Sequence, residues 1–215
     1  PEVIVEKRTG TFSLGNEAKK ISAEVIVLPA SYSLYPKSID ERIPFQVLCD
    51  PDDESYPDLV IVIADAANLK RSLFLCSQII DLKIPTLLAL NMMDLAQRKG
   101  LDIDIKKLSD KLGIPVIPMN AIRNQGITEL KKALLNSFSS PQKDFTDVKK
   151  YSPGLTEEIK TVISVQSEYA AFQVANNFEW ISAFHLTPEK TARLQKIISD
   201  RGFNSDSLKA RETLE

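Results

Sequence analysis

Two polar residues, Asn91 and Asp94, follow an apolar run at a spacing that could read a purine base. The carboxylate of Asp94 could accept hydrogen bonds from the N1–H and the 2-amino group of guanine. Adenine offers no such pair of donors, so a buried carboxylate left unpaired would disfavour it. The Asn91 side chain could tie neighbouring loops together and contact N7 of the base. Taken alone, the Asn-x-x-Asp spacing is more typical of a helix cap at a strand–helix junction.

The elements around these residues alternate between strand and helix patterns. Helical spacing of apolar residues separates short runs that are rich in Val, Ile and Leu. This alternation favours an α/β fold with a mostly parallel sheet covered by helices on both faces. The predicted strands lie at 23–29, 58–65, 85–91 and 114–119, and the predicted helices at 68–83, 104–113 and 126–138.

The ends of three predicted strands carry polar residues. Asp65, Asn91 and the pair Met119-Asn120 each stand where a strand should stop. Since ligands of open α/β sheets bind at the carboxyl ends of the strands, these residues are expected to lie near one another.

The remaining chain predicts further elements. Residues 2–14 alternate with period two around Thr9-Gly10, which indicates a hairpin or two sheet strands. Residues 38–50 favour a helix in spite of Pro44. A polar, proline-bearing stretch follows at 139–154. Beyond it the strand pattern disappears, and helices are expected at 155–178, 187–202 and 204–215.

Composition narrows the function classes. The chain has 215 residues and a formal net charge of −2, which implies no bulk attraction to nucleic acid or anionic lipid. No run approaches the ~20 apolar residues of a membrane helix. Cys49 and Cys76 lie in apolar helical patterns and are expected to be reduced core residues. The chain starts at Pro1 and stops inside a helical pattern, so it is expected to be a piece of a longer protein.

Other polar residues favour ordinary structural roles. His185, the single histidine, is expected at the surface or in packing. The acidic stretch 52–54 predicts a solvated turn rather than a weak cation site, and the basic pair 98–99 is expected to be solvated. No Ser/His/Asp or Cys/His nucleophilic set can be assembled, so we predict neither a catalytic residue nor a metal ligand.

Several stretches resemble the G domain of the ferrous iron transport protein B (FeoB) family. They are YSLYPKSIDER, ADAANLKRSLFL, ALNMMDLA and the run from DIKKLSDKLG to ITELKKAL. The resemblance implies a Ras-like P-loop GTPase-type sheet with helices on both faces, followed by a small all-α domain. It implies a GTPase-like domain over 1–140 without its phosphate loop, a linker over 141–153 and a helical domain over 154–215.

The resemblance also implies residue roles. Asn91 and Asp94 match the guanine-specificity motif, with Met92 inside it. Residues 31–38 match the second switch loop, and residues 1–6 match the first. The nucleotide-contacting loop, Ser-Ala-x in the family, corresponds here to Asn120, Ala121 and Ile122.

Three departures from the family pattern concern the phosphate side of the site. No G-x-x-x-x-G-K-[ST] loop occurs in the sequence. Ile4 stands where the first switch carries a magnesium-binding threonine. Val27 replaces the Asp that holds the water of the metal, and Ala30 replaces the Gly whose amide meets the γ-phosphate. With these parts missing, a useful rate of GTP hydrolysis is not expected, so the enzyme assignment is left open.

The missing loop has a structural consequence. In this fold the strand before the phosphate loop is central, and without it the strands at 23–28 and 58–64 lose the partner between them. Either these two strands close up on each other, or the molecule has residues before Pro1; the second alternative is favoured.

The resulting hypothesis is a guanine-nucleotide-binding domain of a FeoB-like iron(II) transporter at the cytoplasmic face of the inner membrane. It would couple GTP binding and hydrolysis to Fe²⁺ uptake. The implied cofactors are GTP or GDP with Mg²⁺, and the implied partners are the transmembrane part of the same transporter and small accessory transport proteins, with no nucleic acid. One alternative is a degenerate, non-hydrolysing pseudo-GTPase acting as a binding or regulatory module. A further alternative is a fold remnant without ligand.

Overall fold

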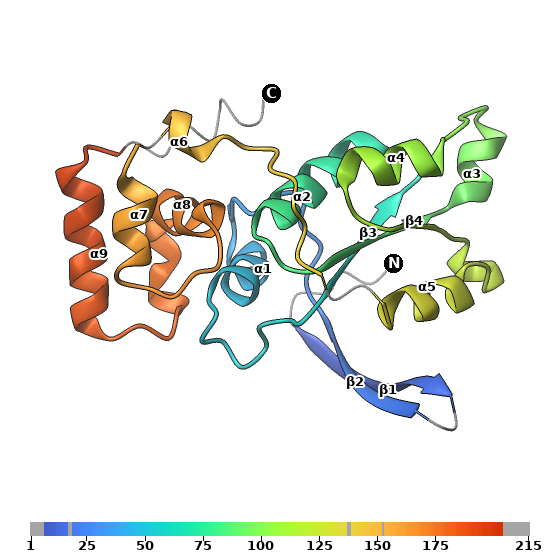
Figure 1. Ribbon diagram of the computed structural model, residues 1–215, viewed down its shortest axis with the longest axis horizontal. Coiled ribbons are helices and arrows are strands. Elements are labelled where there is room, and N and C mark those ends of the chain that lie inside the picture. The colour runs from blue at the N-terminus through green and yellow to red at the C-terminus, as the bar shows by residue number, and fades with distance from the viewer. Residues whose placement is uncertain (1–6, 17–18, 137–138, 152, 204–215) are drawn as a thin grey trace. The chain divides into compact units, whose positions relative to one another are not determined.

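The structure is a computed structural model that describes residues 7–16, 19–136, 139–151 and 153–203. The described residues form two compact units (Figure 1). The sheet unit contains residues 7–27 and 58–143, and the helical unit contains residues 28–57 and 144–203.

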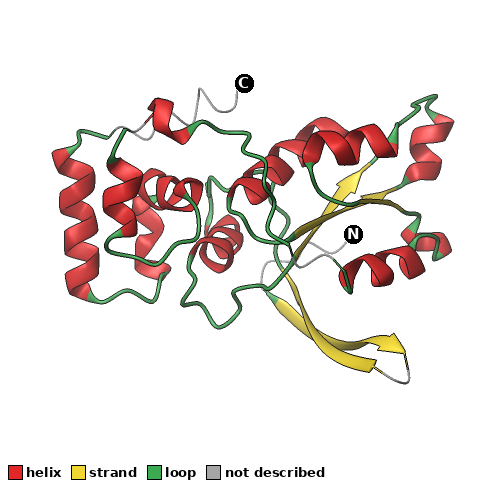
Figure 2. Cartoon of the chain, in the orientation of Figure 1, coloured by secondary structure: helices red, strands yellow, loops and turns green. Residues whose placement is uncertain are grey.

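A parallel three-stranded sheet forms the centre of the sheet unit. Its strands, β3 (Val60–Asp65), β4 (Thr86–Asn91) and β5 (Val116–Pro118), lie in the order β3-β4-β5. Helices α2 (Leu69–Asp81) and α4 (Ile105–Leu112) cover one face, and α5 (Ile127–Leu134) covers the other (Figures 1 and 2). The alternation of strand and helix predicted from the sequence is therefore confirmed.

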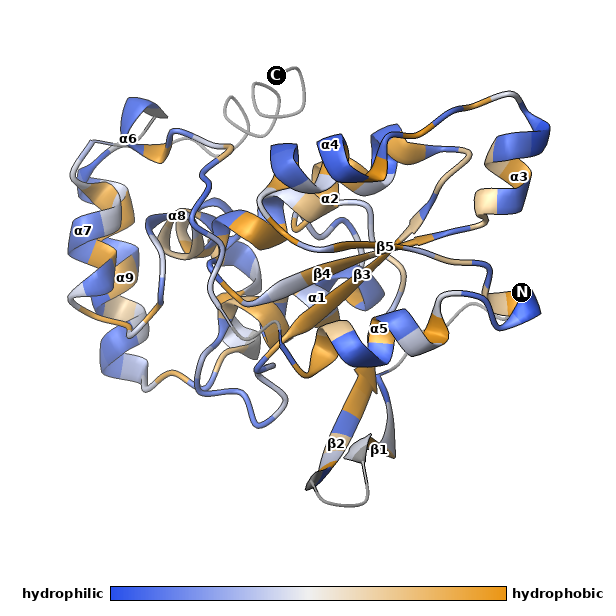
Figure 3. Ribbon diagram, turned by 45° about the vertical axis from the view of Figure 1, so that its right-hand side comes forward, coloured by the Kyte–Doolittle hydropathy of each residue, from blue (hydrophilic) through white to orange (hydrophobic). Residues whose placement is uncertain are grey.

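The central strand β4 is apolar on both faces because both faces are covered. Leu87, Leu88 and Leu90 have no exposed surface, and Figure 3 shows the hydrophobic colouring that runs along this sheet. A strand buried on two sides reads as a continuous apolar run rather than as an alternating one. Burial on both faces therefore explains why the residues before Asn91 form a continuous apolar run.

A hairpin of β1 (Arg8–Asn16) and β2 (Lys19–Val27) packs against this sheet. Leu14 shares an apolar cluster with Leu87 of β4 and Leu134 of α5. The prediction of a turn at Thr9-Gly10 is wrong, because β1 runs straight through these residues and Gly10 lies opposite Val25 in the ladder. A continuous strand is needed to carry the apolar side chains of β1 into the cluster.

The two strands that were expected to lack a partner do not pair with each other. Among the described strands, β2 pairs with β1 alone and β3 pairs with β4 alone, so they belong to separate sheets. The alternative in which these strands close up is therefore wrong for the described residues.

The helical unit is built from α-helices and one 3₁₀ helix, and it contains no described strand. Its helices are α1 (Ile39–Cys49), α6 (Val148–Tyr151), α7 (Leu155–Lys160), α8 (Glu168–Asn176), η2 (Phe178–Ala183, the 3₁₀ helix) and α9 (Pro188–Asp200). The prediction of one helix over 155–178 is wrong, because α7 ends at Lys160. Ser167 then starts α8 by accepting a hydrogen bond from the backbone N–H of Ala170 at 3.0 Å.

The core of the helical unit joins α1 and α8 to the segment after η2. Phe45 of α1 is completely buried, and its ring centroid lies 5.2 Å from that of Phe184. Asn177, also completely buried, donates from its side chain to the carbonyl of Leu34 at 3.1 Å. Residues 34 and 45 are thus held in the same core as the C-terminal helices.

The domain boundaries at 140, 153 and 154 stay a prediction. The compact units differ from them, since residues 28–57 group with 144–203. The predicted helix over 204–215 and the first switch segment 1–6 lie outside the described residues. No helix within the described ranges has both the length and the apolar character needed to cross a membrane.

Both cysteines are expected to resist alkylation in the folded chain. Cys49 and Cys76 are buried and free, and burial raises the pKa of Cys76 to about 12 and raises that of Cys49 as well. Because the thiolate is the reactive form, iodoacetamide should modify the folded chain slowly and the urea-unfolded chain quickly. Mass spectrometry of timed samples measures this, and rapid labelling of the folded chain would contradict the packing described here.

Candidate functional site

The carboxyl ends of the three parallel strands bring the predicted site residues to one edge of the sheet. Asp65 lies opposite Asn91 in the register of β3 and β4. The backbone N–H of Met119 donates to the carbonyl of Leu90 at 2.8 Å, which places Asn120 beside the end of β4. The expected convergence of these strand ends is confirmed.

Asn91 joins the end of β4 to the loop after β5. Its side-chain oxygen Oδ1 accepts a hydrogen bond from the backbone N–H of Ala121 at 3.0 Å. The backbone of the same segment is tied as well, since Met93 N–H donates to the carbonyl of Met119 at 3.3 Å. The Asn91 amide therefore fixes where the 120–123 backbone stands relative to the Asn-x-x-Asp turn.

The loop after β5 is closed by its own hydrogen bonds. Asn120 and Gln125 exchange two backbone hydrogen bonds, of 3.1 and 3.0 Å. The side chain of Asn120 accepts from the backbone N–H of Arg123 at 3.2 Å and caps the short 3₁₀ helix η1 (Ala121–Arg123). An asparagine at this position can thus hold the loop in place of the serine that the family pattern carries.

Asp94 stands in the first turn of α3 (Met93–Arg98) and borders a cavity. The cavity has a volume of about 390 Å³ and is lined by Asp94, Gln97, Arg98 and Arg123. Oδ2 of Asp94 also accepts from Nη2 of Arg98 at 3.2 Å, and the Arg98 side chain is 72% exposed. The carboxylate is therefore open to the cavity and carries an exposed cationic neighbour one helical turn away.

Two apolar side chains near this carboxylate face solvent. Met92 precedes α3 in the left-handed backbone region, with φ of 62°, and its side chain is partly exposed. Ile122 is 93% exposed on η1. Exposed apolar side chains beside a carboxylate are suited to contact with the flat faces of a planar ligand.

The residues on the phosphate side do not fit a magnesium ion. Val27 ends β2 and Ala30 lies in the loop beyond it, and neither side chain carries an oxygen ligand. Within the described ranges, no group of three or more His, Cys, Asp or Glu side chains could hold a metal. Ile4 falls outside the described residues.

Three lining residues of the cavity were not singled out from the sequence. Gln97, Arg98 and Arg123 border it together with Asp94. Arg98 is solvated, as expected, but it also lies beside Asp94. The signal for Arg98 was present in the sequence: an arginine four residues after an aspartate on a helix lies on the same face. Arg123 comes from a different element, so no local pattern pointed to it.

The fold and the strand-end loops define the chain as a Ras-like, GTPase-type α/β domain with an accompanying helical unit. The sequence profile described as "Ferrous iron transport protein B" matches residues 1–134. The chain belongs to this family, FeoB.

Full-length relatives agree with this assignment. The chain is 41% identical over 140 residues to the Fe(2+) transporter FeoB of Legionella pneumophila (strain Paris), covering 63% of this chain and 18% of the relative. It is 38% identical over 132 residues to the Fe(2+) transporter FeoB of Escherichia coli (strain K12), covering 61% and 17%. The chain thus spans less than a fifth of the length of these curated relatives.

Solved structures of the family match both in fold and in sequence. The cytosolic domain of T. maritima FeoB in its GMPPNP form aligns with a TM-score of 0.63 and 28% identity, covering 94% of this chain and 82% of that one. The G domain of Methanococcus jannaschii FeoB aligns with a TM-score of 0.54 and 41% identity, covering 62% and 81%. The predicted Ras-like fold and the predicted family are confirmed.

Proposed function

We propose that this chain binds a guanine nucleotide at the edge formed by Asn91, Asp94 and residues 120–122. The observation that carries the proposal is the open carboxylate of Asp94, which stands beside a loop that the Asn91 side chain holds in place. A carboxylate in this position can accept from guanine N1–H and the 2-amino group. Relatives support it, since the cytosolic domain of T. maritima FeoB has been solved in a GMPPNP form and in a GDP form.

Each residue of the site has a distinct task in this proposal. Asp94 selects the base, and Asn91 positions the loop and contacts N7. A backbone N–H of the 120–122 loop donates to the guanine oxygen, with Asn120 holding the loop, while Met92 and Ile122 offer apolar contact to the ring. No described residue is proposed as a ligand of the Mg²⁺ that the family implies.

In the whole protein, this nucleotide-binding region would serve a ferrous iron transporter. The relatives named above are Fe(2+) transporters of which this chain covers less than a fifth. We propose that the domain lies on the cytoplasmic face of the membrane and relays its nucleotide state to a transmembrane part that carries Fe²⁺. Small accessory transport proteins are further proposed partners.

Fluorescent GDP tests the binding step. The full chain should bind it, and unlabelled GDP or GTP should displace it while ADP or ATP should not. Absence of saturable binding, or equal displacement by adenine nucleotides, would overturn the proposal. Phosphate release from GTP, followed in the same samples, separates a hydrolysing domain from one that only binds.

Replacing Arg98, the cationic neighbour of Asp94, is expected to tighten GDP binding slightly. In the nucleotide-free chain Arg98 competes with the base for Oδ2 of Asp94, and an exposed i,i+4 ion pair is worth about 0.3–0.5 kcal/mol. Arg98→Ala should therefore lower the Kd for fluorescent GDP about twofold, and this difference should shrink in high salt. Lys99→Ala, which removes the adjacent exposed cation, is the matched control; equal effects of both variants would point to a general charge effect instead.

A further inference from the structure

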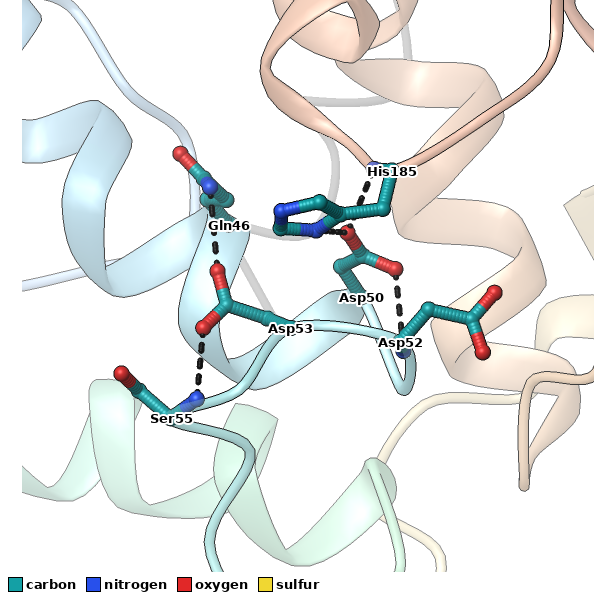
Figure 4. Close-up of polar contacts among 6 residues, drawn as sticks. All are labelled: Gln46, Asp50, Asp52, Asp53, Ser55 and His185. Carbon is teal, nitrogen blue, oxygen red and sulfur yellow. Dashed lines mark hydrogen bonds and ion pairs between the residues drawn. The ribbon is translucent and has the colours of Figure 1, made fainter.

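A buried carboxylate in the helical unit is bound by the only histidine of the chain. Oδ2 of Asp50 accepts from the backbone N–H of His185 at 2.9 Å and lies 3.0 Å from ring atom Nδ1 of the same residue (Figure 4). Because a carboxylate only accepts, Nδ1 must carry the hydrogen of this second bond. The side chain of Asp50 is 2% exposed, whereas that of His185 is 54% exposed. One partner is therefore fixed in the core and the other can exchange protons with solvent.

The turn that carries Asp50 is organised by its own carboxylates. The remaining oxygen of Asp50, Oδ1, accepts from the backbone N–H of Asp52 at 3.2 Å. Asp53 accepts from the Gln46 side chain at 3.0 Å and from the backbone N–H of Ser55 at 2.8 Å (Figure 4). Asp53 is buried, so the expectation of a fully solvated acidic turn is wrong at this residue. The turn thus presents a preformed acceptor to His185.

The contact joins two parts of the helical unit that are far apart in sequence. Asp50 directly follows α1, and His185 lies 135 residues later, between η2 and α9. Next to it, Phe184 packs on Phe45 of α1. The polar contact therefore closes the solvent side of an apolar junction between α1 and the C-terminal helices.

Among the described residues, the charges that shift the pKa of His185 are acidic and belong to this turn. The pKa of His185 is raised from its usual value of 6.5, chiefly by the hydrogen bond with Asp50. Desolvation opposes this rise, and the negative charges of Asp50, Asp53 and Glu54 add to it. A protonated imidazole makes a charge-assisted bond to Asp50. When the proton leaves, the neutral ring can still donate from Nδ1 to the Asp50 carboxylate, but the attraction between two opposite charges is lost.

We propose that the Asp50–His185 contact is a pH-sensitive latch that holds α1 and its following turn against the segment before α9. The latch is closed while the imidazole is protonated and loosens when the proton leaves. Its contribution to stability is present in full below pH 6.5 and falls as the pH rises through the higher pKa of the folded chain. This regulation is separate from the nucleotide site and does not depend on nucleotide binding.

The single histidine makes the latch directly measurable. An NMR titration of the full chain follows one imidazole, in the folded state and in urea. We expect His185 to titrate at a higher pH in the folded chain than in urea, and the amide signals of residues 52–55 to move with the same midpoint. An equal midpoint in both states, or amide signals that ignore the titration, would overturn the proposal.

Variants separate the latch from a merely structural contact. Asp50→Asn should return the imidazole midpoint toward the urea value, whereas Asp52→Asn, which removes an exposed charge of the same turn, should leave it nearly unchanged. Should Asp50→Asn not fold, His185→Gln replaces it. The stability difference between the parent chain and His185→Gln must then decrease as pH rises from about 6 to 8, and a constant difference would refute the latch.

Discussion

Replacing Asp94 by alanine is expected to weaken GDP binding by about a hundredfold. Without the carboxylate, the N1–H and the 2-amino group of guanine lose their acceptor. Each unmet donor costs roughly 1–1.5 kcal/mol, and two of them correspond to about two powers of ten in Kd. Fluorescent GDP titrated into the full chain measures the loss, with circular dichroism confirming that the variant is folded.

A second substitution at the same position tests whether Asp94 reads the base edge. Asp94→Asn keeps one oxygen acceptor and replaces the other by an amide NH₂ group. This NH₂ donor matches the C2 carbonyl of xanthine. We therefore expect this variant to prefer xanthosine diphosphate over GDP, which reverses the preference of the parent chain. Asp102→Asn, a matched change at an exposed loop aspartate, should alter neither affinity. Unchanged GDP binding in Asp94→Ala would remove the basis of the proposed site.

Replacing Gly126 by alanine is expected to destabilise the sheet unit by about 3 kcal/mol. Gly126 has φ of +82°, and a Cβ built there would lie 2.4 Å from the carbonyl oxygen of Pro118 and 3.0 Å from Cγ of Met119. The backbone of β5 or the 120–126 loop must therefore shift. Urea denaturation followed by circular dichroism measures the loss, and GDP binding should weaken too, because the loop carries Ala121.

Gly100→Ala provides the control for backbone strain. Gly100 also has a positive φ, of +71°, but no atom lies within 4 Å of its built Cβ. This variant should lose only about 1 kcal/mol of unfolding free energy, from backbone strain, and should leave GDP binding unchanged. If both variants lost the same free energy of unfolding, the close contact at Gly126 would have no energetic weight.

Local sequence patterns were sufficient for most elements of the sheet unit. The buried run before Asn91, the helix that ends at Gly113 and the strand-end position of Asp65 each follow from periodicity or from a stop residue. The pattern also placed Asn91 and Asp94 at a strand end. These features could be predicted because they are set by residues within one or two turns of each other.

Contacts between distant segments were not predictable in this way. The pairing of β1 with β2 overrode the glycine signal at Thr9-Gly10, since the ladder and the cluster around Leu14 favour a continuous strand. The expected helix over 155–178 divides because Ser167 begins a new helix, α8, which is buried from Tyr169 to Asn176.

The sequence alone indicated the family through its resemblance, and short-range spacing placed most strands and helices and put Asn91 and Asp94 at a strand end. Only the tertiary structure decided that Asn91 holds Ala121, that Arg123 borders the Asp94 cavity, and that His185 meets Asp50. The physical reason is that these arrangements bring together residues 29 to 135 positions apart: Asp94 and Arg123 line one cavity, and Asp50 is bonded to His185. No local periodicity encodes which distant residues come together.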